Sequence, residues 1–353
     1  MVIHSIVDST QQAICPMIGV TEYMIAQAVH DLSGSKSKCD IVALEDLGFS
    51  NNVFRMLGGF FTGMFIEWDP DISFVPVDAT INACGVSVYE CQEISSFEQF
   101  EKRVRKAEKD LDALGIKNNF NIGNHFISYS RDEFGRSYLI IHASDNSYKY
   151  GEKGLYPEPG CWYWKDLKVK MFQNRYLRYL CGETAKTFYE FYLQAEENNP
   201  KRNDLMAGLI LGENNCDKVL YSQHYGMPTS SSIAIGCQWR QGDKMLLTRR
   251  GQPIFVIDDY NQRFNLFPHG LGVRLNGELE SLQLEEEQML INSISVDSHV
   301  KMLESGLVEN RFLEHKINDE FLKSFLKNRQ FKVKKQLTQI YSYSRFGIDK
   351  FDI

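Results

Sequence analysis

Five residues of types that bind metals or act as nucleophiles stand at predicted strand ends or in glycine-containing turns. They are Cys84 in NACGV, His125 in GNHFI, His142 in IIHAS, His224 in SQHYG and His269 in PHGLG. A cysteine with several histidines is a ligand set for a transition metal such as zinc, and a neutral imidazole can also act as a nucleophile. Their spacings are too long for a local metal motif, so only the fold could assemble a site from them.

Each of these residues also has an ordinary structural explanation. A lone cysteine is commonly buried as a small apolar side chain, and a lone histidine at a strand end commonly hydrogen-bonds within its turn. Asp78 precedes Cys84 in the segment PVDATINACGVSVYE and is a further candidate ligand. Residue type alone leaves the structural and the functional explanation open.

The order of these segments resembles the motif series of the RtcB family of RNA ligases over residues 75–275. That family has an Asp-x-x-Cys-Gly turn, an Asn-His-Phe motif, a His-Ser-Gly turn, a further metal histidine, an Arg-Lys-Gly strand and a His-Gly-x-Gly loop. This chain reads, in the same order, NACGV, GNHFI, IIHAS, SQHYG, TRRGQP and PHGLG. Six short matches in one order are more specific than any single one.

The resemblance implies a metal site and a covalent histidine intermediate. Cys84, His125, His142 and His224 would bind a divalent metal, usually manganese in that family, with zinc as the alternative that the residue types favour. His269 would attack the α-phosphorus of GTP and pass GMP to an RNA 3′-phosphate, which a 5′-hydroxyl then attacks. The implied contacts to the nucleotide come from six residues: Asn124, Arg249, Arg250, Gly270, Gly272 and Arg274.

Several positions differ from the family pattern. Ile81 stands where the family has its metal-binding aspartate, so Asp78 would have to take that part, and Ser128 replaces a glutamate. The segments ASDNSYKYG and IDDYNQ replace two phosphate-binding or nucleotide-binding loops, and Asp258 and Asp259 add negative charge there. Two other hypotheses therefore stay open: a divergent metalloenzyme acting on another phosphate or nucleotide, and a ligase-like binding protein without catalysis.

Composition sets limits on partners and location. The 39 basic and 46 acidic residues give a net charge of −7, so RNA ends or a nucleotide would have to be held by a local basic groove. Eight cysteines without a CxxC pair argue against a disulfide framework and favour a reducing compartment. We expect no membrane segment and no signal peptide, hence a cytoplasmic protein, with dedicated export as the alternative. Nothing in the sequence indicates a protein partner.

Hydrophobic spacing predicts helices around a strand-rich middle. A helix is expected over 96–114, with Ser95 and Glu98 as its capping box and Gly115 at its end. A helical block is expected over 170–212, and two charged helices over 279–294 and 318–328. Six strands are expected in NHFISYS, YLIIHAS, KVLYSQHYG, SSIAIGCQW, KMLLTRRG and QPIFVIDDY.

These elements predict an α+β (mixed α/β) fold, a single RtcB-like domain with a strand-rich core and flanking helices. We expect the catalytic domain to span residues 1–295. We expect residues 296–353 to form a helical C-terminal extension packed on it.

Overall fold

The structure is a computed structural model of the chain, and part of the chain is described. The described residues are 2–3, 9–48, 55, 58–151, 154–172, 175–212, 215–248, 250–258, 266–270, 274–275, 312–313 and 332–352. Strands and helices are both abundant among them, so the predicted α+β fold is confirmed. No helix in the described ranges is long and apolar enough to span a membrane.

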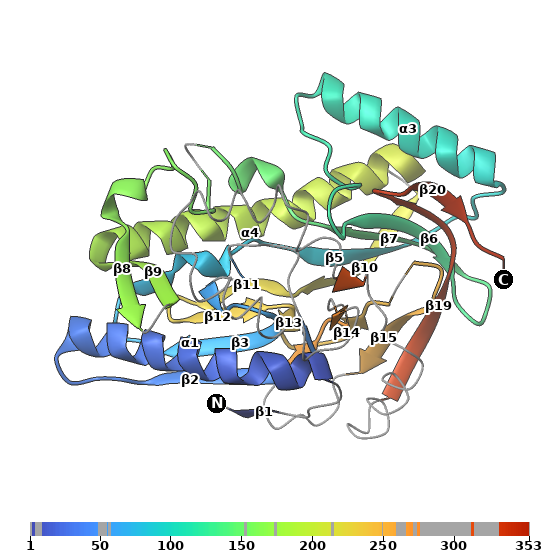
Figure 1. The fold of residues 1–353 in the computed structure, drawn as a ribbon. Coiled ribbons are helices and arrows are strands. Elements are labelled where there is room, and N and C mark those ends of the chain that lie inside the picture. The colour runs from blue at the N-terminus through green and yellow to red at the C-terminus, as the bar shows by residue number, and fades with distance from the viewer. Residues whose placement is uncertain are drawn as a thin grey trace.

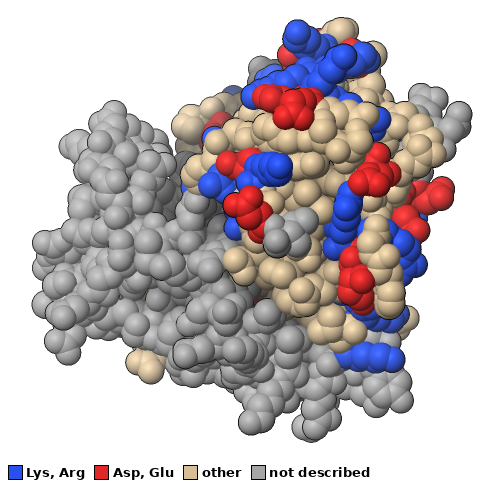
Figure 2. All heavy atoms as spheres, turned by 90° about the vertical axis from the view of Figure 1, so that its right-hand side faces the viewer, with Lys and Arg blue, Asp and Glu red and all other residues tan. Residues whose placement is uncertain are grey.

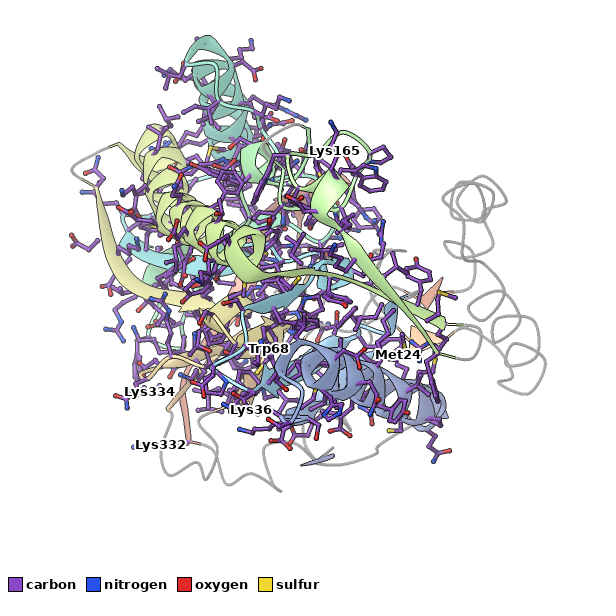
Figure 3. All side chains as sticks on the ribbon, turned by 90° about the vertical axis from the view of Figure 1, so that its left-hand side faces the viewer. Met24, Lys36, Trp68, Lys165, Lys332 and Lys334 are labelled. Carbon is purple, nitrogen blue, oxygen red and sulfur yellow. The ribbon has the colours of Figure 1, made fainter. Side chains whose placement is uncertain are left out.

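A five-stranded sheet forms one side of the molecule, with strands in the order β1-β2-β3-β12-β11. Helix α1 (Ser9–Ser33) lies along β2 and β3 (Figure 1). Met24 of α1 and Trp68 of β3, both labelled in Figure 3, belong to the core between them. The strands are β1 (Val2–Ile3), β2 (Cys39–Gly48), β3 (Thr62–Trp68), β11 (Tyr225–Thr229) and β12 (Ser232–Ile235).

An eight-stranded sheet forms the other side, in the order β10-β5-β7-β6-β19-β15-β14, with β20 paired to β19. Helices α3 (Phe97–Ala113) and α4 (Gly182–Leu211) cover one face of it (Figure 1). The strands are β5 (Gly85–Cys91), β6 (Phe126–Arg131), β7 (Ser137–Ala143), β10 (Cys216–Gln223), β14 (Lys244–Leu246), β15 (Ile254–Asp258), β19 (Lys332–Ser344) and β20 (Gly347–Lys350).

Short elements lie outside the two large sheets. The remaining strands form three small sheets: β4 (Phe74–Pro76) with β9 (Arg175–Cys181) and β8 (Lys168–Phe172), β13 (Cys237–Gln238) with β16 (Phe267–Pro268), and β17 (Arg274–Leu275) with β18 (Phe312–Leu313). The 3-10 turns are η1 (Val77–Ala79), η2 (Asn146–Tyr148) and η3 (Trp164–Asp166). Helix α4 contributes to the cores of both sides, because its first half packs in one and its second half in the other.

Several sequence predictions are confirmed and one is shifted. All six predicted strand segments contain strands, and α3 occupies the predicted helix. Its N-cap is Ser96 instead of Ser95, and the Ser96 side chain accepts a hydrogen bond from the Gln99 amide. Ser-x-x-Gln is the same capping pattern displaced by one residue. Gly115 adopts the expected left-handed conformation, with φ of 71°.

Two predicted helical regions are wrong in part. Residues 170–172 and 175–181 of the expected helical block belong to strands β8 and β9. Helix α4 starts only at Gly182, whose φ of 60° separates strand from helix. Residues 332–344 of the expected C-terminal helical extension form β19, which pairs with both β6 and β15. Its β-branched and aromatic residues suit a strand. The helices predicted over 279–294 and 318–328 lie outside the described residues.

Charged side chains are mixed on the face that Figure 2 shows. Lysine and arginine side chains lie beside aspartates and glutamates there. On α3, Arg105 pairs with Glu108 and Lys106 pairs with Asp110. The basic residues of this helix therefore belong to an ordinary solvated surface.

Candidate metal and nucleophile site

Strand pairing brings Cys84, His125 and His142 to one end of the eight-stranded sheet. Cys84 directly precedes β5, His125 directly precedes β6, and His142 lies near the end of β7, which is between them. In the register of the sheet, His142 is opposite both Val86 and Phe126. Residues far apart in the sequence are therefore neighbours because β7 is paired on both sides.

His224 lies where the chain passes from one large sheet to the other, between β10 and β11. Its amide donates to the Cys84 carbonyl at 3.1 Å, which fixes it beside the cysteine. Its carbonyl accepts from the Cys237 amide at 2.9 Å. Gly236, the residue before Cys237, also forms a backbone hydrogen bond: its carbonyl accepts from the His269 amide at 3.3 Å. The loops that carry His224 and His269 are thus tied together.

Cys84, His142 and His224 form a compact buried group of potential ligands. The Cys84 Sγ and His142 Nε2 atoms are 3.2 Å apart, and the Nε2 atoms of His142 and His224 are 3.1 Å apart. All three ligand atoms lie within 4.8 Å of one another. A single cation placed between them could contact all three.

Hydrogen bonds orient these imidazoles with their Nε2 atoms toward one another. The His142 Nδ1 atom is 3.0 Å from the Asn124 carbonyl oxygen, and the His224 ring hydrogen-bonds to the backbone of Ser222. A carbonyl oxygen only accepts, so Nδ1 of His142 carries the hydrogen and its Nε2 atom presents a lone pair. Two lone pairs directed toward the same point can bind one cation, and such carbonyl contacts are typical of metal-bound histidines.

His125 lies at the margin of this group. Its Nδ1 atom is 2.8 Å from the Asn119 carbonyl, which leaves Nε2 as an acceptor. That Nε2 atom is 3.0 Å from the Ser144 hydroxyl and 3.9 Å from the Cys84 sulfur. His125 is therefore close enough to join the ligands after a small rearrangement, with Ser144 as its present partner.

Burial determines the protonation states in this region. It raises the pKa of the Cys84 thiol to about 11, although the positive charges of Lys149 and Arg55 act in the opposite direction. It lowers the pKa of His224 well below its usual value, and neighbouring His269 adds to this effect. The imidazole is therefore neutral near neutral pH, and a bound metal would have to displace the proton of Cys84.

His269 forms a dyad with Asp46, a residue that the sequence analysis did not select. The His269 Nδ1 atom is 2.8 Å from the Asp46 Oδ2 atom, which also accepts from the Gly270 amide at 3.0 Å. Both side chains are 1% exposed. The His269 Nε2 atom has no hydrogen-bond partner among the described residues, and its ring centroid is 4.9 Å from that of His224. An oriented, unpartnered nitrogen thus lies beside the candidate ligands.

Asp46 had a weak signal in the sequence. It lies in the segment DIVALEDLG, where Glu45 and Asp46 interrupt an apolar stretch that forms the buried end of β2. A carboxylate at such a position must find a partner in the fold. The distance of 223 residues between Asp46 and His269 concealed that partner.

Asp78 does not join the candidate ligands. Its carboxylate is completely buried and accepts hydrogen bonds from the Arg178 guanidinium, including contacts of 3.0 and 3.1 Å to Arg178 Nε. The predicted metal role of Asp78 is thus replaced by a buried ion pair with β9. Arg178 had no counterpart in the sequence predictions.

The predicted nucleotide contacts are distributed unevenly. Asn124 and Gly270 are at the site, where their backbone groups hold His142 and Asp46. Arg250 is not, because it pairs with Asp349 of β20 at 2.9 Å and lies over the Phe346 ring. Arg249 and Gly272 lie outside the described residues, as does the side chain of Arg274.

Comparisons with known proteins add no assignment. No protein-family model matches this chain, and no curated protein matches it either.

Proposed function

We propose that this protein is a metal-dependent nucleotidyltransferase whose chemistry is similar to that of RtcB-type RNA ligases, with His269 as the nucleophile. The observation that carries the proposal is the position of the His269 Nε2 atom, which is buried, unpartnered among the described residues and next to the Cys84–His142–His224 group. The order of the six sequence motifs supplies the reaction class. Manganese is the proposed metal, with zinc as the alternative that the ligand types favour.

In the proposed reaction His269 and Asp46 act together. The Nε2 lone pair of His269 attacks the α-phosphorus of GTP, the new N–P bond forms, and the bond to the pyrophosphate oxygen breaks. Asp46 stabilises the positive charge that develops on the imidazole, because its carboxylate holds the Nδ1 hydrogen. A bound divalent ion would offset the negative charge of the phosphates. An oxygen of an RNA 3′-phosphate then attacks the phosphorus of the GMP on His269, and the N–P bond breaks. A 5′-hydroxyl attacks the activated 3′-phosphate, which joins the two RNA ends and releases GMP.

Covalent labelling tests this proposal. The full chain is incubated with manganese and each α-labelled nucleoside triphosphate in turn, and the label that remains on denatured protein is counted. We expect label from GTP on the unaltered protein and none on His269→Ala. His30→Ala is the matched control, because His30 is an exposed histidine at the end of α1. Equal labelling of the His269→Ala variant, or no labelling of metal-loaded protein, would contradict the proposal.

A second candidate is supported by the loss of Asp78 from the site. With Asp78 held by Arg178, three residues remain for one ion, and three protein ligands with an open position are characteristic of catalytic zinc. His269 would then act as a general base toward a metal-bound water, and the substrate would be another phosphate ester or nucleotide. Bound metal with phosphate release and without covalent label would favour this candidate. Absence of bound metal would favour the non-catalytic binding protein.

A further inference from the structure

Lys149 is a buried cation without a counter-ion in the described part of the protein. It is 8% exposed, and no carboxylate there lies within ion-pair distance of its ammonium group. Asp145, four residues before Lys149, accepts hydrogen bonds from Ser147 and Asn198 instead. A nearly buried ammonium group without a carboxylate partner is placed to bind an anion that reaches it from solvent.

Hydrogen bonds connect the segment around Lys149 to Cys84. The Lys149 carbonyl accepts from the Tyr156 amide at 3.0 Å, and the Tyr156 hydroxyl accepts from the Asn82 side chain at 2.9 Å. The Asn82 Oδ1 atom in turn accepts from the Cys84 amide at 3.0 Å. The backbone of Lys149 is thereby linked to the segment that carries Cys84.

The charge of Lys149 acts on these ligands. Burial lowers the pKa of His125 well below its usual value, and Lys149 is the largest charge that adds to this effect. Burial raises the pKa of the Cys84 thiol, and among the charges that oppose this rise Lys149 is again the largest, followed by Arg55. Arg55 is itself fixed by the carbonyls of Ala79 and Thr80 at 2.8 and 2.7 Å.

Lys149 and Arg55 thus place positive charge on this side of the metal group. Of the two acidic residues near the site, Asp78 is paired with Arg178, whereas Asp46 hydrogen-bonds to His269, which the proposed reaction requires as a neutral nucleophile. A divalent ion on Cys84, His142 and His224 would add to the positive field. A compact, multiply charged anion such as a phosphate group matches these charges better than a neutral or cationic ligand does.

We propose that Lys149 binds a phosphate group of the substrate beside the metal ligands. This inference rests on the proposed function for the kind of substrate, and it assigns a phosphate contact to the segment SYKYG. The ammonium group would donate hydrogen bonds to phosphate oxygens that the metal and His269 leave free.

Phosphate binding to the metal-loaded full chain tests this inference with inorganic phosphate as the probe. Isothermal titration should show that Lys149→Met weakens phosphate binding about tenfold or more, the loss expected for one charged hydrogen bond. Lys149→Arg retains the charge and should bind within a few-fold of the unaltered protein. Lys165→Met is the control, because Lys165 is exposed on the outer surface (Figure 3).

Metal content and thermal unfolding, measured on the same samples, separate a local effect from misfolding. The inference predicts unchanged metal content for Lys149→Met, together with the loss of phosphate affinity. Equal phosphate affinity in Lys149→Met and the unaltered protein would overturn it, and so would absence of phosphate binding by the metal-loaded unaltered protein. Loss of the His269 label with Lys149-dependent phosphate binding intact would instead count against nucleotidyl transfer alone.

Discussion

Because the hydrogen of the His269 imidazole is on Nδ1, its Nε2 atom keeps a lone pair that can act as a nucleophile. Asp46 fixes that hydrogen, since its Oδ2 atom accepts from both His269 and the Gly270 amide. Neither Asp46 Oδ1 nor His269 Nε2 has a hydrogen-bond partner among the described residues. A buried carboxylate and imidazole in this arrangement favour one tautomer and leave one nitrogen available for reaction.

Asp46→Asn should remove the negative charge that stabilises the imidazolium formed during attack. The asparagine oxygen can still accept from both His269 Nδ1 and the Gly270 amide, so the tautomer is kept while the charge is lost. We expect covalent labelling to slow by about 10²-fold or more. Labelling rate and metal content are measured together. Unchanged labelling by Asp46→Asn would show that the charge of Asp46 does not assist a nucleophile.

The ion pair of Asp78 and Arg178 predicts a stability effect without a metal effect. Arg178→Met leaves a buried carboxylate alone and should lower the free energy of unfolding by about 3–5 kcal/mol. Asp78→Asn should leave metal affinity unchanged, because Asp78 is not among the candidate ligands. Denaturant unfolding and metal titration check the two parts. A large drop in metal affinity for Asp78→Asn would restore it as a ligand.

At the scale of elements, a glycine lets the loops of His224 and His269 approach each other. Gly236 has φ of 65°, and a Cβ atom there would lie 2.8 Å from the His269 ring. The backbone bond from His269 to Gly236 holds the two loops at this distance. A larger residue at position 236 cannot fit without moving the imidazole.

Gly236→Ala should therefore impair labelling more than it impairs stability. Positive φ alone destabilises an alanine by about 1 kcal/mol or somewhat more, and the contact with His269 adds displacement of the nucleophile. Gly242→Ala is the matched control, since Gly242 has φ of 99° and a Cβ atom there would meet nothing within 4 Å. Similar labelling by the two variants would show that the ring contact is unimportant.

The sequence predicts individual strands and helices better than it predicts which of them pair in the fold. Period and composition identify the strand ends that carry Cys84, His125 and His142, because those signals are local. That His142 lies between the other two depends on the pairing of β7 with both β5 and β6, which no local signal encodes. Asp46 and Arg178 escape prediction for the same reason, since each is defined by a distant partner.

At the scale of the whole molecule, the site lies where two sheets meet. Asp46 comes from the five-stranded sheet, Cys84 and His142 come from the eight-stranded sheet, and His224 lies on the connection between them. Strand β19, from the last part of the chain, lies in the eight-stranded sheet between β6 and β15. The site therefore depends on the assembled fold, because its residues come from strands of both sheets.

Buried neutral histidines make the stability of the metal-free protein dependent on pH. The pKa of His125 and that of His224 are both lowered by burial in the folded state. Below about pH 6.5 the unfolded chain binds protons at these positions and the folded chain does not, so the free energy of unfolding falls as pH falls. We expect a loss of about 1.4 kcal/mol per pH unit for each histidine between about pH 6 and 5.

Denaturant unfolding of metal-free protein across that range measures the slope. His125→Gln removes one of the two titrating groups. It should reduce the slope of the unfolding free energy against pH by the contribution of about one proton, and this holds even if the substitution also changes the absolute stability. A slope that His125→Gln leaves unchanged would mean that His125 titrates alike in the folded and unfolded chain.

The central claim is that Cys84, His142 and His224 bind one metal ion beside His269. X-ray absorption spectroscopy of zinc-loaded protein tests it most directly. The claim predicts one sulfur at about 2.3 Å and two or three imidazole nitrogens at about 2.0–2.1 Å, with the sulfur lost in Cys84→Ser. A zinc ion with only oxygen and nitrogen neighbours, or a spectrum that Cys84→Ser leaves unchanged, would contradict it.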